Sequence, residues 1–267
     1  MQFVYLSRIC YTKFSLFKEQ HLMKRFFKYL GYIISLMIIA LALIYLFADK
    51  VDFLFLQNTN SSQLSSQTLS KNFHNRQKAE YNWHKVKDTN AMAIAKNKIK
   101  HTPKVIALVT QPQAKVASSV VAGVSNNDLA VAAGTLRPDQ EPGKNNYVLA
   151  GHHLPQTDWA LFSGIYYYAK PKQNVYLTDL KHVYQYQIKD VQFINANAVY
   201  IANKNNYRLG IFNTVKDKPM ITLFSCDATG EKRIAEFGSL IHTYQVTDKA
   251  IPQEAITGFK KAGLFKW

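Results

Sequence analysis

The longest uninterrupted apolar stretch of the chain lies close to its N-terminus. The run Tyr29–Phe47, YLGYIISLMIIALALIYLF, contains no charged residue. As a helix with a rise of about 1.5 Å per residue, it is just long enough to span the apolar core of a bilayer. A buried core helix would rarely stay apolar on every face, and a cleaved signal peptide would have a shorter apolar region followed by a small-x-small site. The pattern therefore predicts an uncleaved signal anchor, a transmembrane helix over residues 29–47.

The charges on either side of this run predict its orientation. Before it, the acidic residue Glu19 stands among the basic residues Arg8, Lys13, Lys18, Lys24, Arg25 and Lys28. Flanks rich in lysine and arginine stay in the cytoplasm. We therefore expect a cytoplasmic basic tail over residues 1–28, a single pass through the cell membrane, and an extracellular location for the rest of the chain.

The residues after the predicted anchor change from apolar to polar and then to an alternating pattern. The stretch Gln57–Asn72 is rich in serine and asparagine, which is typical of a flexible stalk, and we assign residues 48–80 to a linker. From Pro103 onward, short β-branched and aromatic runs are separated by Gly, Pro, Asn and Asp, as strands are. The runs are KVIALVT, AKVASSVVAG, NNYVLAGHH, NVYLTD, HVYQYQIKDVQFI, MITLFSC and SLIHTYQV. Seven or eight strands with few helices predict a mostly β domain over residues 81–267, either a closed barrel or a sandwich.

Composition narrows the environment in which this domain works. The chain of 267 residues is 48% hydrophobic, has a formal net charge of +16 and a pI near 9.7. The basic residues are scattered, and no recognisable nucleic-acid-binding module accompanies them. We therefore expect an anionic surface, lipid head groups or an acidic envelope polymer, as the partner of this charge, and no nucleic acid.

Cys226 is the first candidate for chemistry. The other cysteine, Cys10, lies on the opposite side of the predicted anchor, so the two should not pair. Cys226 closes the strand-like run MITLFSC, and strand ends present side chains at the rim of a barrel. A lone cysteine is either a nucleophile or an inert, buried small hydrophobe.

Two histidines favour the nucleophile. His152 and His153 end another strand-like run, NNYVLAGHH. A thiol needs a base or a cationic partner to become a thiolate, and an imidazole at a neighbouring strand end could supply either. The alternative is a pair of surface histidines in a loop.

An arginine follows the cysteine at a distance that suits a strand–loop–strand connection. If Asp227 to Lys232 form the loop, Arg233 opens the next strand and returns beside Cys226. Its guanidinium could stabilise an oxyanion or hold substrate carbonyls; the alternative is a solvated arginine at a strand edge. Alternation along the strand sends Lys232 to the opposite face.

Metal chemistry has weaker support in the sequence. Cys226, His152 and His153 could hold zinc, but the spacing is not of the CxxC or HxxxH kind and no fourth ligand is evident. Calcium needs a cluster of carboxylates, and Asp128, Asp139 and Glu141 are too sparse to form an evident one. We therefore expect no cofactor and no metal, although calcium dependence stays open.

Three stretches together resemble the sortases, the cysteine transpeptidases of Gram-positive bacteria. They are TLFSC at 222–226 with an arginine a short loop later, AAGTLRPDQEPGKNNYVLAGHH at 132–153, and LFSGIYYYAKPKQNVYLTD at 161–179. The family's cysteine motif is usually TLxTC, so Ser225 replaces the second threonine and keeps a hydroxyl. The likeness runs from about Val105 to about Val246. A single N-terminal anchor without a second span near the C-terminus is similar to class A.

The resemblance implies a closed β-barrel of roughly eight strands and a transpeptidase reaction. Class A sortases cleave an LPXTG sorting signal between Thr and Gly and join the threonine to an amine of a lipid-linked peptidoglycan precursor, through a thioacyl-enzyme. Cys226 would be the nucleophile, His152 the general acid and base, and Arg233 the oxyanion partner, with His153 as an accessory residue. The substrate pocket would be lined by Ala133, Thr135, Leu136, Val199, Ile201 and Ser225.

Two other functions stay open on the residues alone. The first is a non-catalytic, membrane-tethered module that holds anionic cell-wall polymer on the basic barrel. The second is a cysteine hydrolase of the papain type. That type places its cysteine early, at the start of a helix, and its histidine later, whereas this chain has the reverse order and a strand-like setting.

Overall fold

The computed structural model describes residues 23, 25, 27–43, 64–87, 97, 101–155, 157–195, 218–227 and 231–263. Two compact units make up the chain, Met1–Val51 and Asp52–Trp267. The second unit contains a closed barrel with its own hydrophobic core, which is what a domain needs to fold by itself.

Among the described residues of the first unit, residues 27–43 form a helical stretch. Its large apolar side chains are exposed, among them Ile33, Leu36 and Ile38. Among the residues described here, no helix combines the length and the apolar character needed to cross a bilayer. Residues 44–47 of the predicted span and residues 1–22 of the predicted basic tail lie outside the described residues, so the anchor stays a prediction.

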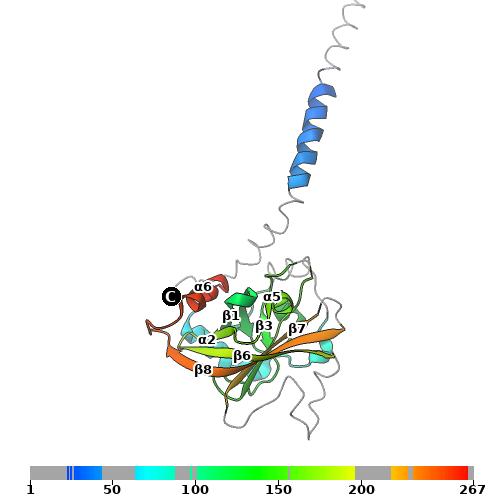
Figure 1. Ribbon diagram of the computed structural model, residues 1–267. Coiled ribbons are helices and arrows are strands. Elements are labelled where there is room, and N and C mark those ends of the chain that lie inside the picture. Colours follow the sequence, from blue (N-terminus) through cyan, green and yellow to red (C-terminus); the bar gives the residue numbers. More distant parts are fainter. Residues whose placement is uncertain are drawn as a thin grey trace, which may run out of the picture. The chain divides into compact units, whose positions relative to one another are not determined.

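The second unit is built around eight strands that close into a barrel (Figure 1). Around the barrel they follow the order β1-β2-β3-β4-β7-β8-β6-β5. Most neighbours are antiparallel, while β2–β3 and β4–β7 are parallel. The predicted closed, mostly β barrel is therefore confirmed. The strands are β1 (Val105–Gln111), β2 (Val116–Val121), β3 (Ala133–Thr135), β4 (Asn146–Ala150), β5 (Asn174–Thr178), β6 (His182–Asn195), β7 (Met220–Cys226) and β8 (Lys232–Gln245).

Alternation along the strands divides the apolar side chains between the barrel interior and its outer faces. The interior cluster includes Tyr147, Leu149, Ile221 and Leu223, all at 0% exposure. Val148 and Ala150 of β4 and Phe224 of β7, which alternate with them, belong to a separate outer cluster. Strands buried on both faces read as nearly continuous apolar runs, which is why NYVLA and MITLFS show little polar alternation.

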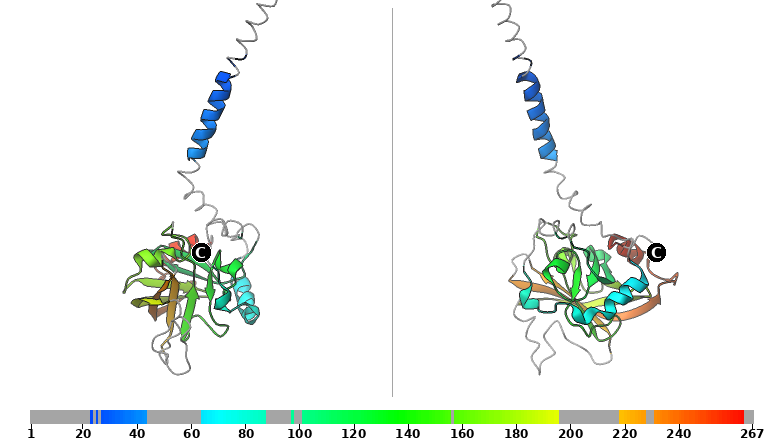
Figure 2. Two further views of the ribbon diagram at one scale, coloured as in Figure 1. Left: turned by 90° about the vertical axis from the view of Figure 1, so that its right-hand side faces the viewer. Right: turned by 180° about the vertical axis from the view of Figure 1, so that it is seen from behind.

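Short helices cover the outside of the barrel (Figure 2). They are α2 (Ser66–His74), α4 (Asn126–Leu129), α5 (Ser163–Tyr168) and α6 (Gln253–Lys261), with the 3-10 turns η2 (Arg76–Lys78), η3 (Trp83–Lys85) and η4 (Pro112–Ala114). The α2 helix begins at an N-cap, where the Ser65 hydroxyl accepts from the backbone N–H of Thr68. Leu69 of α2 is 1% exposed and packs against an outer cluster with α6. Part of the stretch that we assign to a linker is therefore a helix docked on the barrel.

A glycine decides how closely α6 approaches the barrel. A Cβ at Gly258 would lie 2.1 Å from the Thr110 hydroxyl oxygen of β1. Only a residue without a side chain fits there, and Phe259 beside it is fully buried. The sequence pattern alone did not indicate this helix.

The barrel interior also contains an acidic side chain. Glu236 of β8 is fully buried, and one carboxyl oxygen accepts from the Gln111 amide nitrogen at 2.9 Å. Burial raises the pKa of Glu236 to about 8, and the hydrogen bond from Gln111 opposes that shift only in part. The side chain is therefore largely protonated in the folded protein at neutral pH.

The raised pKa predicts how stability depends on pH. The ordinary pKa of a glutamate side chain is 4.5. Between pH 4.5 and about pH 8, the folded state therefore holds a proton on Glu236 that the unfolded state releases. Stability should therefore fall as pH rises through this window, by about 1.4 kcal/mol per unit at most. Glu236→Gln, a neutral side chain of the same shape, should remove this fall and be the more stable protein at pH 8.

Urea unfolding of residues 52–267 at pH 5, 6.5 and 8 measures the effect. Glu231→Gln, which changes an exposed carboxyl, is the matched control and should keep the slope of the wild type. A wild type and a Glu236→Gln variant with parallel pH profiles would contradict the assignment of a buried, protonated acid.

Candidate active site

Strand register brings three of the predicted side chains to one end of the barrel. In the parallel pair β4–β7, Ala150 lies beside Phe224, and the backbone N–H of Gly151 donates to the Phe224 carbonyl at 3.1 Å. The chain leaves β4 there, and His152 follows two residues after the strand ends, at the same end of the barrel at which β7 ends with Cys226. In the antiparallel pair β7–β8, Cys226 lies directly opposite Arg233. Because adjacent strands are about 4.8 Å apart, imidazole, thiol and guanidinium share one edge.

Cys226 points away from the barrel interior. Leu223 belongs to the interior cluster and Phe224 to the outer cluster, so the two-residue period of a strand places Cys226 on the outer face with Phe224. Cys226 forms no disulfide within the described residues, and the residue is partly exposed. A partly exposed cysteine at the rim is placed to react, whereas an inert core cysteine would be enclosed.

The two hydroxyl groups of the TLFSC stretch hydrogen-bond β7 to β4 and to the residue that follows β4. The Thr222 hydroxyl donates to the Asn146 side-chain oxygen at 2.9 Å. The Ser225 hydroxyl donates to the Gly151 carbonyl, also at 2.9 Å, and Ser225 is 1% exposed. These bonds fix the register directly before Cys226, so the structure gives Ser225 a structural contact that the sequence-based assignment to the substrate pocket did not include.

The two histidines have different surroundings. Both are 7% exposed. The His152 carbonyl accepts from the backbone N–H of Phe162 at 3.1 Å, which anchors the loop that leads to α5. His153 lies edge-on to Tyr166, with ring centroids 5.0 Å apart, and 5.7 Å from the ring of Tyr167.

Burial makes His153 a poor carrier of charge. Burial lowers the pKa of His153, while the Asp227 carboxylate and the Cys226 backbone oppose that shift. Neither ring nitrogen makes a hydrogen bond of good geometry within the described part of the chain. A neutral ring between tyrosines supports the strand end mechanically, which suits an accessory residue.

Arg233 occupies a partly buried position between two strands. It pairs with Cys226 of β7 on one side and with Ile194 of β6 on the other. One guanidinium nitrogen, Nη1, donates to the Lys232 carbonyl at 3.0 Å. Lys232 itself is exposed, in keeping with the predicted alternation of the two side chains.

A buried apolar cluster lies on the outer face of β4, β7 and β8, the face that also carries Cys226. Its buried members include Leu136, Val148, Ala150, Phe224 and Ala235. The ring of Trp83 packs on Phe224, with centroids 5.1 Å apart. The sequence did not indicate this contact; a tryptophan in an otherwise polar segment was the available signal.

The remaining predicted pocket residues are spread over different environments. Ala133 is in the interior cluster, and the Thr135 hydroxyl accepts from the backbone N–H of Gly123 at 3.1 Å. Leu136 is in the outer cluster that contains Phe224. Val199 and Ile201 lie outside the described residues.

The acidic residues considered for calcium have basic partners. Asp128 accepts from His101 at 2.7 Å, Asp139 faces Arg137 at 3.4 Å, and Glu141 pairs with Lys144 at 2.6 Å. Across the described ranges, no three His, Cys, Asp or Glu side chains gather as a metal site would require.

Comparison with known proteins agrees with this geometry. The family model described as the sortase domain matches residues 109–241. Sortase A of Streptococcus agalactiae is 26% identical over 238 residues, which cover 85% of this chain and 91% of that protein. Sortase A of Listeria monocytogenes is 32% identical over 145 residues, 54% of this chain and 60% of that protein. The Bacillus subtilis protein YwpE, which is named as a sortase, is 30% identical over its full length, 42% of this chain.

The matched region contains the strands β2 to β7 in full and β1 and β8 in part. It also contains His152, Cys226 and Arg233. The chain therefore belongs to the sortase family of cysteine transpeptidases, and its relatives named sortase A place it in class A.

Proposed function

We propose that this sortase is a membrane-anchored enzyme that cleaves LPXTG-type sorting signals between Thr and Gly. It then joins the threonine carboxyl to an amine of a lipid-linked peptidoglycan precursor, by way of a thioacyl-enzyme. The observation that supports this most directly is the position of Cys226 between the strand ends that hold His152 and Arg233.

The first half of the proposed reaction forms the thioacyl-enzyme. The Cys226 thiolate attacks the carbonyl carbon of the signal's threonine, and the oxyanion that develops faces the Arg233 guanidinium. The Thr–Gly amide bond then breaks. The leaving glycine amine takes a proton from the His152 imidazolium, and the threonine stays bound to sulfur as a thioester.

The second half transfers the threonine to the acceptor. The acceptor amine attacks the thioester carbonyl and gives its proton to His152, which is now neutral. The C–S bond breaks, a new amide bond forms, and the Cys226 thiolate returns. An amine must win against water in this step, so the burial of His152 and the enclosing tyrosines around His153 favour transfer over hydrolysis.

The apolar residues of the sorting signal need an apolar surface next to the thiol. Leu136 in the outer cluster beside Phe224 supports a role in contacting the signal. Ala133, Thr135, Val199, Ile201 and Ser225 remain proposed substrate contacts, and His153 a proposed accessory residue. The proposed anchor rests on the apolar, uncharged run 29–47 with its basic N-terminal flank.

Cleavage of a fluorogenic LPXTG peptide, with and without an added amine, tests the reaction. The wild type should release the fluorophore and, with amine present, form the transpeptidation product at the expense of the hydrolysed one. Cys226→Ala should lower the rate by about 1,000-fold or more, because no nucleophile remains. Mass spectrometry of the enzyme should detect the thioacyl adduct on the wild type.

Three outcomes would count against this proposal. Cleavage that persists in Cys226→Ala would show that Cys226 is not the nucleophile, and hydrolysis whose rate and products do not change with added amine would indicate a plain protease. A chain that binds cell-wall polymer but cleaves no signal peptide would favour the non-catalytic module.

Arg233 and its neighbour offer a matched pair for the oxyanion role. Arg233→Gln removes the guanidinium opposite Cys226 and should lower kcat by about 100- to 1,000-fold, as loss of one oxyanion donor does. Lys232→Gln removes an equal charge from an exposed side chain and should change kcat by less than about twofold. Steady-state kinetics on the LPXTG peptide measure both. Equal losses in the two variants would show that only net charge matters.

A further inference from the structure

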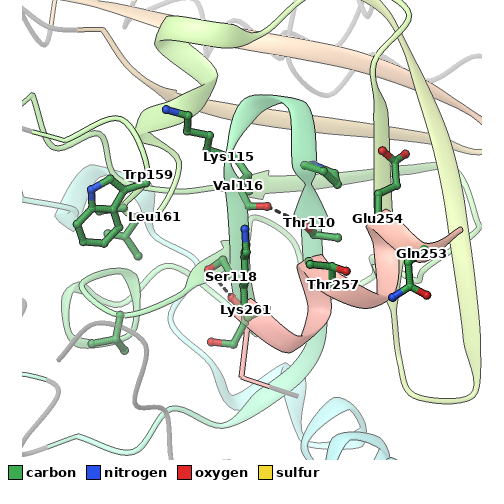
Figure 3. Close-up of a pocket in the computed structure, with 17 residues that line it drawn as sticks. Thr110, Lys115, Val116, Ser118, Trp159, Leu161, Gln253, Glu254, Thr257 and Lys261 are labelled. Carbon is green, nitrogen blue, oxygen red and sulfur yellow. Dashed lines mark hydrogen bonds between the residues drawn. The ribbon is translucent and has the colours of Figure 1, made fainter. Parts of the chain in front are cut away.

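A second concave site lies away from Cys226, between α6 and the β1–β2 hairpin (Figure 3). It encloses about 460 Å³ and is closed on its third side by residues 159–161. In the order of the barrel, β3 and β4 separate β2 from β7. This pocket is therefore distinct from the proposed catalytic edge, and its volume is in the range that holds small organic molecules.

The walls of the pocket are largely apolar. Side chains from the hairpin, from the loop and from the end of α6 form them: Ala117, Val131, Ala160, Leu161 and Ala262. Trp159 adds an indole ring on the loop side (Figure 3). Walls of this kind favour a ligand with an apolar chain or ring over a sugar or a free phosphate.

Most polar groups in the lining are already satisfied within the protein. The Thr110 hydroxyl donates to the Val116 carbonyl at 2.8 Å. Glu254 accepts from the Tyr176 hydroxyl at 2.6 Å and from the Gln113 amide at 3.1 Å. Lys115 is paired with Asp158. These groups form the frame of the pocket and leave little for a ligand to bind.

Ser119 is the exception on the pocket floor. It is 3% exposed, and its hydroxyl oxygen has no hydrogen-bond partner within the described residues. Ser119 lies opposite Leu108, which faces α6 in an outer cluster, so the Ser119 side chain is on the outer face of β2, where the pocket is. A buried hydroxyl without a partner is costly, and because its oxygen has almost no exposed surface here, a ligand oxygen would satisfy it once the serine side chain turns into the pocket.

Lys261 supplies the charge. It is an exposed residue of the last turn of α6 and lines the same pocket. Among the ion pairs of the described residues it has no carboxylate partner, whereas Lys115 at the opposite end does. The pocket therefore presents apolar walls, one buried hydroxyl and one ammonium group that is available to an anion.

We propose that this pocket binds an amphiphilic anion, an apolar chain or ring system that ends in a single carboxylate or phosphate. The apolar body lies along Ala117, Val131 and Leu161, and the acid group is held by the Lys261 ammonium and the Ser119 hydroxyl. Binding at this pocket is independent of the transpeptidase reaction. The α6 helix, which lies beyond the matched sortase domain, builds one wall of it.

Quenching of Trp159 fluorescence tests the proposal on residues 52–267. The probes are 11-bromoundecanoate, 11-bromoundecyl phosphate and the uncharged 11-bromoundecanol, which share one apolar chain that quenches indole through its bromine. We expect saturable quenching by the acids, with a Kd at least about tenfold lower than that of the alcohol, as a charge-assisted hydrogen bond gives. Tighter binding of the carboxylate indicates a fatty acid or similar acid as the source, and of the phosphate a phosphorylated lipid.

Adjacent lysines provide the matched control. Lys261→Gln should remove the preference for acid over alcohol, while Lys260→Gln, on the same turn but outside the pocket lining, should keep it. Ser119→Leu should fill the pocket and abolish quenching. Because both lysines are exposed, their variants remain informative even if Ser119→Leu fails to fold.

Three results would overturn the proposal. They are equal affinity for the acid and the alcohol in the wild type, an unchanged preference in Lys261→Gln, and saturable quenching that persists in Trp159→Phe. The last would assign the signal to Trp83 or Trp267 rather than to Trp159.

Discussion

The register between β4 and β7 is the constraint on which the catalytic edge depends. Side chains alternate across a strand, so a slip of one residue would turn Cys226 into the barrel and carry Ser225 to the surface. Two buried side-chain bonds, from Thr222 to Asn146 and from Ser225 to Gly151, hold the pair in place. The hydroxyl-bearing positions before the cysteine thus set the direction of the thiol.

Burial favours the neutral form of two ionisable side chains of the barrel, one in its interior and one near Cys226. Inside, it keeps Glu236 protonated, so that its side chain takes part in a neutral hydrogen-bond contact with Gln111. At the rim, it holds His153 neutral between two tyrosines, while the positively charged Arg233 remains on the side of Cys226. Charge is thereby confined to the groups that would meet the reacting peptide bond.

The sequence was sufficient where a feature depends on short-range pattern. Runs of β-branched residues between turn signals located most strands, and the positions of His152, Cys226 and Arg233 at strand ends followed from them. The sequence did not predict β3, because its three residues, Ala-Gly-Thr, have no strand signal. Gly134 is needed in this strand because the Gly123 carbonyl approaches it too closely for a side chain. The sequence also did not predict that Trp83 packs on Phe224 or that α2 packs on the barrel, because these contacts join segments far apart in sequence.

The α6 helix and the hydrogen bond of Ser225 were not predicted from the sequence for a different reason. A short amphipathic stretch such as QEAITGFKK is a weak helix signal, and what stabilises it is the fit of Gly258 against Thr110, a tertiary contact. Ser225 sits in a stretch that resembles a family motif, and the resemblance assigned it to the substrate. The structure shows the bond that its hydroxyl makes with the neighbouring strand.

The parallel pairing of β4 with β7 has a consequence for how the protein acquires activity. Two antiparallel strands can join through a tight turn, but this pair needs the chain to pass through α5, β5 and β6 first, and Gly151 meets Ser225 across 74 positions of sequence. Contacts between such distant segments form late in folding. Under the proposed roles of His152 and Cys226, a partly folded chain therefore exposes a sulfur with no imidazole next to it, and transpeptidase activity begins only once the barrel has closed.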